Sequence, residues 1–285
     1  SYQYSEDERM KKGFSTNAFT KFSLSETIEI ISDVGYEGLE IVADVPHAFL
    51  PLTNEKLKQI KHDLENRKLL VSNINANTVL GWNLEKGEDE KFEPSLSNKN
   101  ETLRKWRVEY TKNSIEMAAE LSAPSVCITS GIKNTESIEN EMVQMNKSLL
   151  EVLEFAEKKN ISICMEYEPG LLIEKSDDVF NLFKSFKNLG LNLDTCHVAV
   201  LNENFSKVIH KFKDKIFHTH ISDCKNSIHY HLIPGYGEIS FEEIYSNLKE
   251  INYDGFLTAE LYTYAQKPRE AASETFIFLN NLIDC

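Results

Sequence analysis

Apolar and polar positions follow one repeating order along the chain. A short apolar or alternating run precedes a longer stretch whose apolar residues recur at helical spacing. The runs typical of strands are 13–19, 38–44, 70–78, 125–131, 161–168, 191–195, a run from 216, and 255–261. The longest stretches typical of helices are 52–68, 101–123, 135–160 and 268–283.

Eight strand–helix units in succession favour parallel strands joined by right-handed crossovers. Eight such units in 285 residues fit an α/β fold, the (β/α)8 or TIM barrel, as a single domain. A doubly wound open sheet is the alternative, but no strand-to-helix turn has the Gly-x-Gly-x-x-Gly pattern of that fold.

Two segments lie outside this repeat. Residues 1–11 are mostly polar, and we expect them to form a disordered N-terminal extension to a barrel of residues 12–285. Residues 79–100 are irregular and acidic, and roughly 20 residues is long for a connection inside a compact domain. We expect this loop to be a lid with Trp82 over the barrel mouth; a disordered insertion is the alternative.

The composition narrows the class of partner. The net charge of −14 disfavours nucleic acid and anionic membranes as partners, because their phosphates attract basic surfaces. Five cysteines, an odd number without a close pair, favour reduced thiols and a cytoplasmic protein. No apolar run approaches the length of a transmembrane helix.

Histidines gather in the run that starts at residue 216. His218 and His220 share its polar face, because side chains alternate across a strand, and His229 and His231 follow in the next loop. This face could bind a metal. A buried histidine in a single strand is more often hydrogen-bonded than metal-bound, so the neighbouring strands decide the interpretation.

Three neighbouring strands also end in polar residues. Glu166 and Glu168 share one face of run 161–168, Asp194 ends the next run, and Glu260 lies near the end of the last. Active sites of such barrels lie at the carboxyl ends of the strands. Because buried carboxylates are costly unless paired or bound to a cation, we expect Glu166, Asp194, His220 and Glu260 to bind one divalent metal. Three oxygens and one nitrogen favour Mn²⁺ ahead of Mg²⁺, Co²⁺ or Zn²⁺.

At these residues the sequence resembles the xylose isomerase-like barrel superfamily, which contains sugar phosphate isomerases and epimerases and the apurinic-site (AP) endonucleases of family 2. The resemblance spans nearly all of 13–283. Its motifs are Gly35-Tyr-Glu-Gly-Leu-Glu40, Met165-Glu166-Tyr-Glu-Pro-Gly170, Leu193-Asp194-Thr-Cys-His197, His218-Thr-His220, His231-Leu-Ile-Pro-Gly-Tyr-Gly237 and Ala259-Glu260-Leu261.

The resemblance implies roles for individual residues. Glu166, Asp194, His220 and Glu260 would be the metal ligands, and Glu166 and Glu260 would also move protons as catalytic residues. His197 and His231 would contact the substrate, and we extend this expectation to Trp82, Asn75 and Glu168. An alternative for both histidines is that they orient Asp194 and His220.

The sequence departs from the ketose epimerases of that superfamily at two positions. Asn226 stands where those enzymes have an arginine, and Leu172 where they have a second glutamate, which argues against a free ketose as substrate. The three-zinc endonucleases need further histidines. His47 is a candidate, but the third strand offers asparagines instead.

We therefore expect a metal-dependent isomerase or epimerase that acts on a sugar, sugar phosphate or cyclic polyol through an enediolate. A small carbohydrate is the expected partner, and a homo-oligomer is left open. The alternative function is a metal-dependent phosphoester hydrolase of the AP endonuclease type. A non-catalytic binding barrel is a third interpretation, but it would not need four convergent ligands.

Overall fold

Eight parallel strands form a closed barrel in the computed structural model, which describes residues 9–284. Each strand pairs with the next, and β8 pairs with β1. The strands are β1 (Lys11–Ser15), β2 (Gly38–Val42), β3 (Leu70–Asn75), β4 (Ser125–Ile128), β5 (Ser162–Met165), β6 (Leu189–Asp194), β7 (Ile216–Ile221) and β8 (Phe256–Ala259). The predicted TIM barrel is confirmed.

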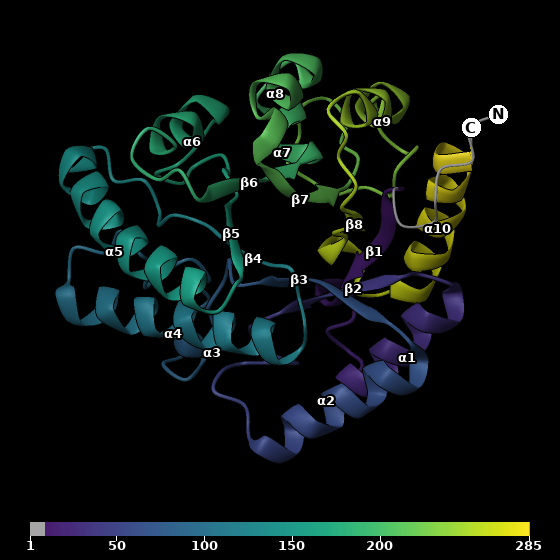
Figure 1. Cartoon of the computed structure of the whole chain (residues 1–285), viewed down its shortest axis with the longest axis horizontal. Helices are drawn as coiled ribbons and strands as arrows, with labels where there is room; N and C mark the ends of the chain where they lie inside the picture. Colours follow the sequence, from purple (N-terminus) through teal and green to yellow (C-terminus); the bar gives the residue numbers. More distant parts are fainter. Residues whose placement is uncertain (1–8, 285) are drawn as a thin grey trace.

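Helices surround the strands and cover the outer side of the barrel (Figure 1). They are α1 (Leu24–Val34), α2 (Asn54–Arg67), α3 (Leu80–Leu84), α4 (Glu101–Glu120), α5 (Ile138–Lys158), α6 (Ser176–Leu182), α7 (Thr195–Val200), α8 (Phe205–Lys211), α9 (Phe241–Glu250) and α10 (Pro268–Asp284). Among residues 9–284, no helix is long and apolar enough to span a bilayer.

Alternation along the strands separates an apolar outer surface from a polar interior. Leu39, Ile74 and Leu191 have no exposed area and lie on the face toward the helices. Their neighbours Glu40 and Asn192 are equally buried but lie inside the barrel. The helical layer therefore supplies the apolar core, and the barrel interior holds hydrogen-bonding groups.

Local signals set the ends of several helices. Ser23 and Glu26 form the reciprocal capping box expected at the start of α1, and Gly35 ends that helix with a φ of 113°. The similar pattern at Ser240 and Glu243 predicts a second capping box. That prediction is wrong, because the Ser240 side chain makes no capping hydrogen bond.

The barrel begins earlier than the sequence predicts. Met10 is buried, Lys11 opens β1, and Arg9 forms an ion pair with Glu37 at 2.7 Å. Residues 9–11 thus belong to the fold, whereas residues 1–8 of the expected extension lie outside the described residues.

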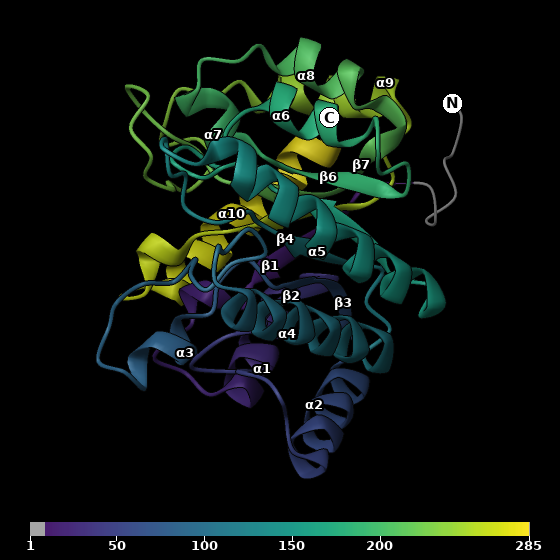
Figure 2. The same ribbon diagram turned by 90° about the vertical axis from the view of Figure 1, so that its left-hand side faces the viewer.

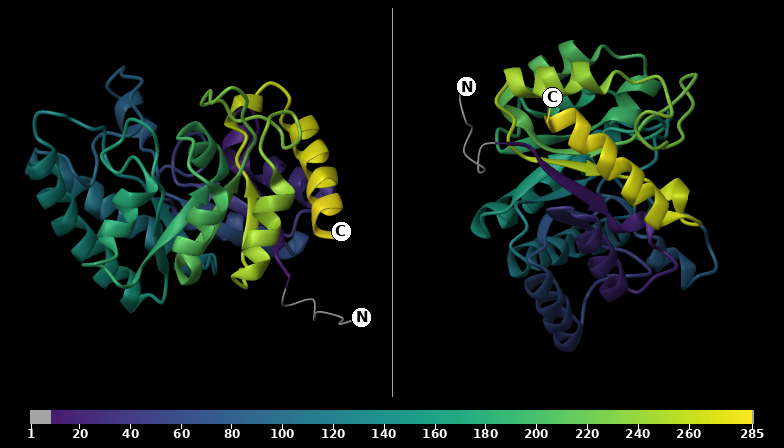
Figure 3. Two further views of the ribbon diagram at one scale, coloured as in Figure 1. Left: turned by 90° about the horizontal axis from the view of Figure 1, so that it is seen from above. Right: turned by 90° about the vertical axis from the view of Figure 1, so that its right-hand side faces the viewer.

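Two long connections project from the end of the barrel where the strands terminate (Figures 2 and 3). One joins β3 to α4 and includes α3; the other joins β7 to α9. The first is anchored by Asp44, whose carboxylate accepts hydrogen bonds from the backbone N–H groups of Leu80 and Gly81 at 2.7 and 2.9 Å. This end is where parallel-barrel chemistry is expected.

Candidate active site

Four side chains from successive strands meet at that end. Glu166 follows β5, Asp194 ends β6, His220 lies in β7 and Glu260 follows β8. Their ligand atoms all lie within 4.8 Å of one another, and all four residues are buried. Nδ1 of His220 is 2.6 Å from Glu166, 3.5 Å from Glu260 and 3.9 Å from Asp194. The structure therefore brings together the four predicted ligands.

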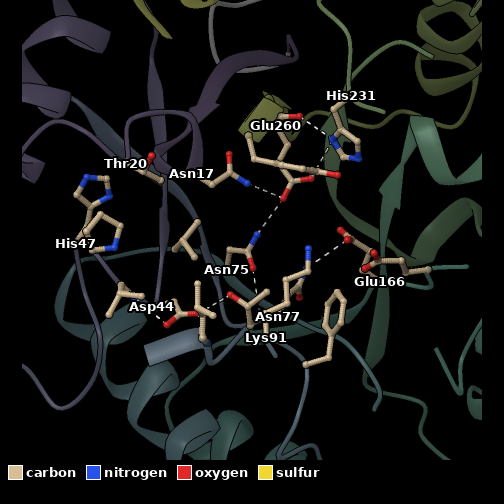
Figure 4. Close-up of a pocket in the computed structure, with 18 of the residues that line it drawn as sticks. Asn17, Thr20, Asp44, His47, Asn75, Asn77, Lys91, Glu166, His231 and Glu260 are labelled. Carbon is tan, nitrogen blue, oxygen red and sulfur yellow. Dashed lines mark hydrogen bonds and ion pairs between the residues drawn. The ribbon is translucent and has the colours of Figure 1, made fainter. Parts of the chain in front are cut away.

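Asparagine amides hold the carboxylates of both glutamates. Asn77 donates to Oε1 of Glu166 at 3.2 Å, and Asn17 donates to Oε1 of Glu260 at 3.0 Å, with Asn75 at 3.4 Å (Figure 4). In both glutamates the other oxygen, Oε2, is the one that approaches His220. Asn192 also donates to Oε2 of Glu166, so the amides orient both carboxylates at the centre of the cluster.

The cluster carries more negative than positive charge. Burial raises the pKa values of Glu166, Asp194 and Glu260 and outweighs the attraction of His220. Burial by itself would lower the pKa of His220, but Glu260, Glu40 and Glu166 hold it well above its ordinary value. Three carboxyl groups that resist ionisation beside one imidazole are the electrostatic environment that a bound cation relieves.

The donor set fits a divalent cation. Oδ2 of Asp194 is buried and has no hydrogen-bond partner, although a buried carboxylate oxygen normally has one. Three carboxylates and one imidazole suit Mn²⁺, Mg²⁺ or Co²⁺, and also Zn²⁺. These residues would hold the cation; that they do so remains a prediction.

A cavity of about 230 Å³ opens beside this cluster (Figure 4). Asn75, Glu168, His197 and His231, which the sequence suggests as substrate contacts, all line it. Burial raises the pKa of Glu168 to about 8. Four of the five residues predicted to contact the substrate therefore line the cavity next to the four-residue cluster.

The two histidines present acceptor nitrogens to the cavity side of the cluster. Nδ1 of His197 lies 2.8 Å from the carbonyl oxygen of Tyr167, and Nδ1 of His231 lies 2.8 Å from that of Glu260. A carbonyl only accepts, so each Nδ1 carries the proton and each Nε2 is an acceptor. Nε2 of His231 has no hydrogen-bond partner, whereas Nε2 of His197 faces Nε2 of His229. Burial lowers the pKa of both residues, which keeps the rings neutral.

Comparison with known proteins identifies the family of this barrel. The family model of the xylose isomerase-like TIM barrel matches residues 28–282. The chain belongs to the xylose isomerase-like TIM barrel family. The resemblance predicted from the motifs is confirmed.

Three proteins illustrate what the chain is similar to. It is 26% identical over 268 residues to fructoselysine 3-epimerase of Shigella flexneri, covering 91% of this chain and 93% of the relative. A solved D-tagatose 3-epimerase-like protein is 25% identical, with a TM-score of 0.77, and 95% and 99% of the two chains are covered. The IOLI protein, solved with a zinc atom bound, shares the fold at 19% identity, a TM-score of 0.78 and coverage of 96% and 98%.

Trp82 is not where the sequence suggests. It does not line the cavity of this family member but stacks on Trp106 of α4, with ring centroids 4.2 Å apart. The short helix α3 places the indole against α4, where it is partly buried. Lys91 and Phe92 from the same loop line the cavity instead.

His47 also lines the cavity, but it joins none of the groups of metal-binding side chains found among residues 9–284. Its Nε2 lies 2.9 Å from the carbonyl oxygen of Phe22. The structure thus gives His47 a backbone partner in place of the ligand role considered for the endonucleases.

Sequence reasoning missed several residues of the site. Asn77 was recognisable, because it shares the inward face with Asn75. Asn192 donates a hydrogen bond to Glu166. Glu40 contacts His220 from the side opposite the three carboxylates. Glu40 could have been suspected, because it is a charged residue inside the apolar run Gly38–Val42. Asn17 lies in a 3-10 helix, Thr16–Ala18, inside the run 13–19 that the sequence predicts as strand, so its position was not predicted. Lys91 and Phe92 come from an irregular loop, for which periodicity gives no signal.

Proposed function

We propose that the protein is a divalent-metal-dependent isomerase or epimerase of a small carbohydrate, with Glu166 and Glu260 as the proton-transfer groups. The observation that carries the proposal is the convergence of Glu166, Asp194, His220 and Glu260 beside a cavity lined by neutral imidazoles. Family membership and relatives named as 3-epimerases support the sugar isomerase and epimerase class.

The two glutamates are placed for proton transfer. A bound divalent cation would polarise a substrate carbonyl as a Lewis acid. Glu166 and Glu260 approach His220 from different strands, so one can remove a proton α to the carbonyl while the other returns one.

The lining of the cavity suits hydroxyl groups. Nε2 of His231 is buried without a hydrogen-bond partner, and Nε2 of His197 faces Nε2 of His229 at 3.1 Å. The free acceptor on His231 suits an O–H group of a sugar or polyol. Lys91 is the one lysine or arginine among the described lining residues, so a phosphate group would find a single positive partner.

The proposal is tested with purified protein loaded with Mn²⁺ or Co²⁺. We expect one cation per chain and incorporation of solvent deuterium into a C–H bond of at least one sugar or polyol in a panel. Glu166→Gln and Glu260→Gln should each lower the exchange rate by about 10²–10⁴-fold, the usual contribution of a general acid or base. Exchange at the wild-type rate in both variants would contradict their assignment.

A phosphoester hydrolase of the AP endonuclease type is the second candidate because of one observation. The rings of His197, His229 and His231 lie together, with centroids 4.8, 5.4 and 5.9 Å apart. Two groups that contain them could bind a further metal: Glu168 with His197 and His229, and Asp194 with His197 and His231. The charge of −14 disfavours a DNA substrate.

His197→Ala and His231→Ala separate the two functions. If these histidines contact a carbohydrate, both variants keep the metal content of the wild type and lose exchange activity. A wild type with several metals per chain, which falls in both variants, together with cleavage of duplex DNA at abasic sites, would establish the hydrolase.

A further inference from the structure

Glu40 is a charged residue in the barrel interior that the proposed chemistry does not use. It lies on β2, is completely buried, and forms ion pairs with His218 and His220 but with no lysine or arginine among residues 9–284. Asn73 and Asn75 donate to its two oxygens at 3.0 and 3.1 Å. Because an ionised buried carboxylate is costly, the presence of Glu40 at this position calls for a reason.

His220 connects Glu40 to the cluster. Nε2 of the ring is 2.6 Å from Oε2 of Glu40, whereas Nδ1 faces Glu166, Glu260 and Asp194. The carboxylate accepts, so the proton of this contact belongs to Nε2. On the other side, Nδ1 lies 2.6 Å from Oε2 of Glu166, and it is the ring atom that a cation among the three carboxylates would bind in place of a proton.

We propose that Glu40 is a positioning residue that keeps His220 protonated on Nε2, with Nδ1 directed at the cation, and strengthens it as a ligand. A carboxylate behind a metal-binding imidazole fixes the ring orientation and raises the basicity of the ligating nitrogen. The inference rests on the cation site of the proposed function and is independent of which substrate is converted.

A cation on the other side of the ring is the competing arrangement. Glu40, His218 and His220 also lie within 4.8 Å of one another. That group has one carboxylate against three on the Nδ1 side. Each ring nitrogen lies 2.6 Å from a carboxylate oxygen, Nε2 from Glu40 and Nδ1 from Glu166, so the number of carboxylates and not the distance separates the two arrangements. The cation therefore belongs on the Nδ1 side.

The first test needs no variant of Glu40. Long-range ¹H–¹⁵N correlations of the Zn²⁺-loaded protein give the protonation state of each histidine ring. His220 is identified as the ring whose nitrogen shifts with Zn²⁺ and whose signals are absent in His220→Gln. We expect its Nε2 to be protonated and its Nδ1 to bind the metal; the reverse assignment would overturn the proposal.

The second test measures Co²⁺ affinity by competition with a chromophoric chelator. Glu40→Gln keeps an acceptor oxygen but loses the charge, and Glu40→Met loses both. We expect the affinity to fall about 10-fold for the first and about 100-fold for the second, the range known for partners behind a metal ligand. If Glu40→Met does not fold, the Co²⁺ affinity of Glu40→Gln and the protonation state of the His220 ring still test the proposal.

Asp223→Asn is the matched control. Asp223 is also completely buried, but it accepts hydrogen bonds from the backbone N–H groups of Gly235, Gly237 and Ile239 and is not among the partners of His220. This variant should lose thermal stability and keep its Co²⁺ affinity. If both Glu40 variants bind Co²⁺ with wild-type affinity, the positioning role of Glu40 is wrong but the proposed metal site stands. If the wild-type protein binds no cation, the proposed metal site is wrong as well.

Discussion

The outer and inner surfaces of the barrel strands are both closed to solvent, but they are stabilised in different ways. Leu39 and Ile74 pack against helices on the outer surface, where contacts are non-directional and burial of area is sufficient. On the inner surface, Glu40, Asn192 and His220 are equally buried, and each depends on a particular partner.

The difference shows what the inner surface is for. Burying a polar group stabilises a fold only when its partners are complete. Oδ2 of Asp194 and Nε2 of His231 lack partners, and three carboxyl groups share one imidazole. We therefore expect substitutions on the outer surface of the strands to change the free energy of unfolding, and substitutions on the inner surface to change metal or substrate binding.

Ile74→Ala should give the largest effect on folding. It removes buried methyl groups from the outer surface, so we expect a loss of about 2–5 kcal/mol in the free energy of unfolding and an unchanged metal affinity. Urea unfolding and metal titration measure the two. Ile74→Val, the milder control, should cost about 0.5–1.5 kcal/mol. A drop in metal affinity in folded Ile74→Ala would show that the two surfaces are coupled.

Asp194→Asn should show the opposite response. Asp194 caps α7 by accepting a hydrogen bond from the N–H of His197 at 3.1 Å, and asparagine is an equally good cap. We expect the metal affinity to fall more than about 100-fold, beyond the effect of partners behind a ligand, with little change in thermal stability. Calorimetric titration with Mn²⁺ measures the affinity. Unchanged binding would remove Asp194 from the proposed site.

Cation binding should itself stabilise the wild-type fold. A ligand that binds only the folded state at 100 times its Kd adds about 2.7 kcal/mol. Thermal unfolding with Mn²⁺ and with a chelator measures this difference, which should vanish in Asp194→Asn. Stabilisation of equal size in that variant would place the cation elsewhere.

Trp82→Ala and Phe92→Ala form the pair with the smallest expected effects. Trp82 stacks on Trp106, so its loss should cost about 1 kcal/mol in stability and leave KM unchanged. Phe92 lines the cavity, so its loss should raise KM for a substrate found in the panel. A raised KM in Trp82→Ala instead would restore the lid role first expected of this residue.

The barrel and its four-residue cluster could be predicted because both follow from strand periodicity. Alternation along 161–168 and 216–221 assigns Glu166 and His220 to the inward face, and closure of the barrel brings equivalent positions together. No knowledge of loop conformation was needed. The same periodicity would have placed Asn77 inside.

Only the tertiary structure decided contacts between segments that lie far apart in the chain. Glu40 and His220 are 180 residues apart and meet because β2 and β7 line the same closed interior. Trp82 turned to α4, and Lys91 and Phe92 reached the cavity, because the path of an irregular loop depends on what it packs against. Local sequence determines which face a side chain takes, whereas barrel closure and packing determine its partner.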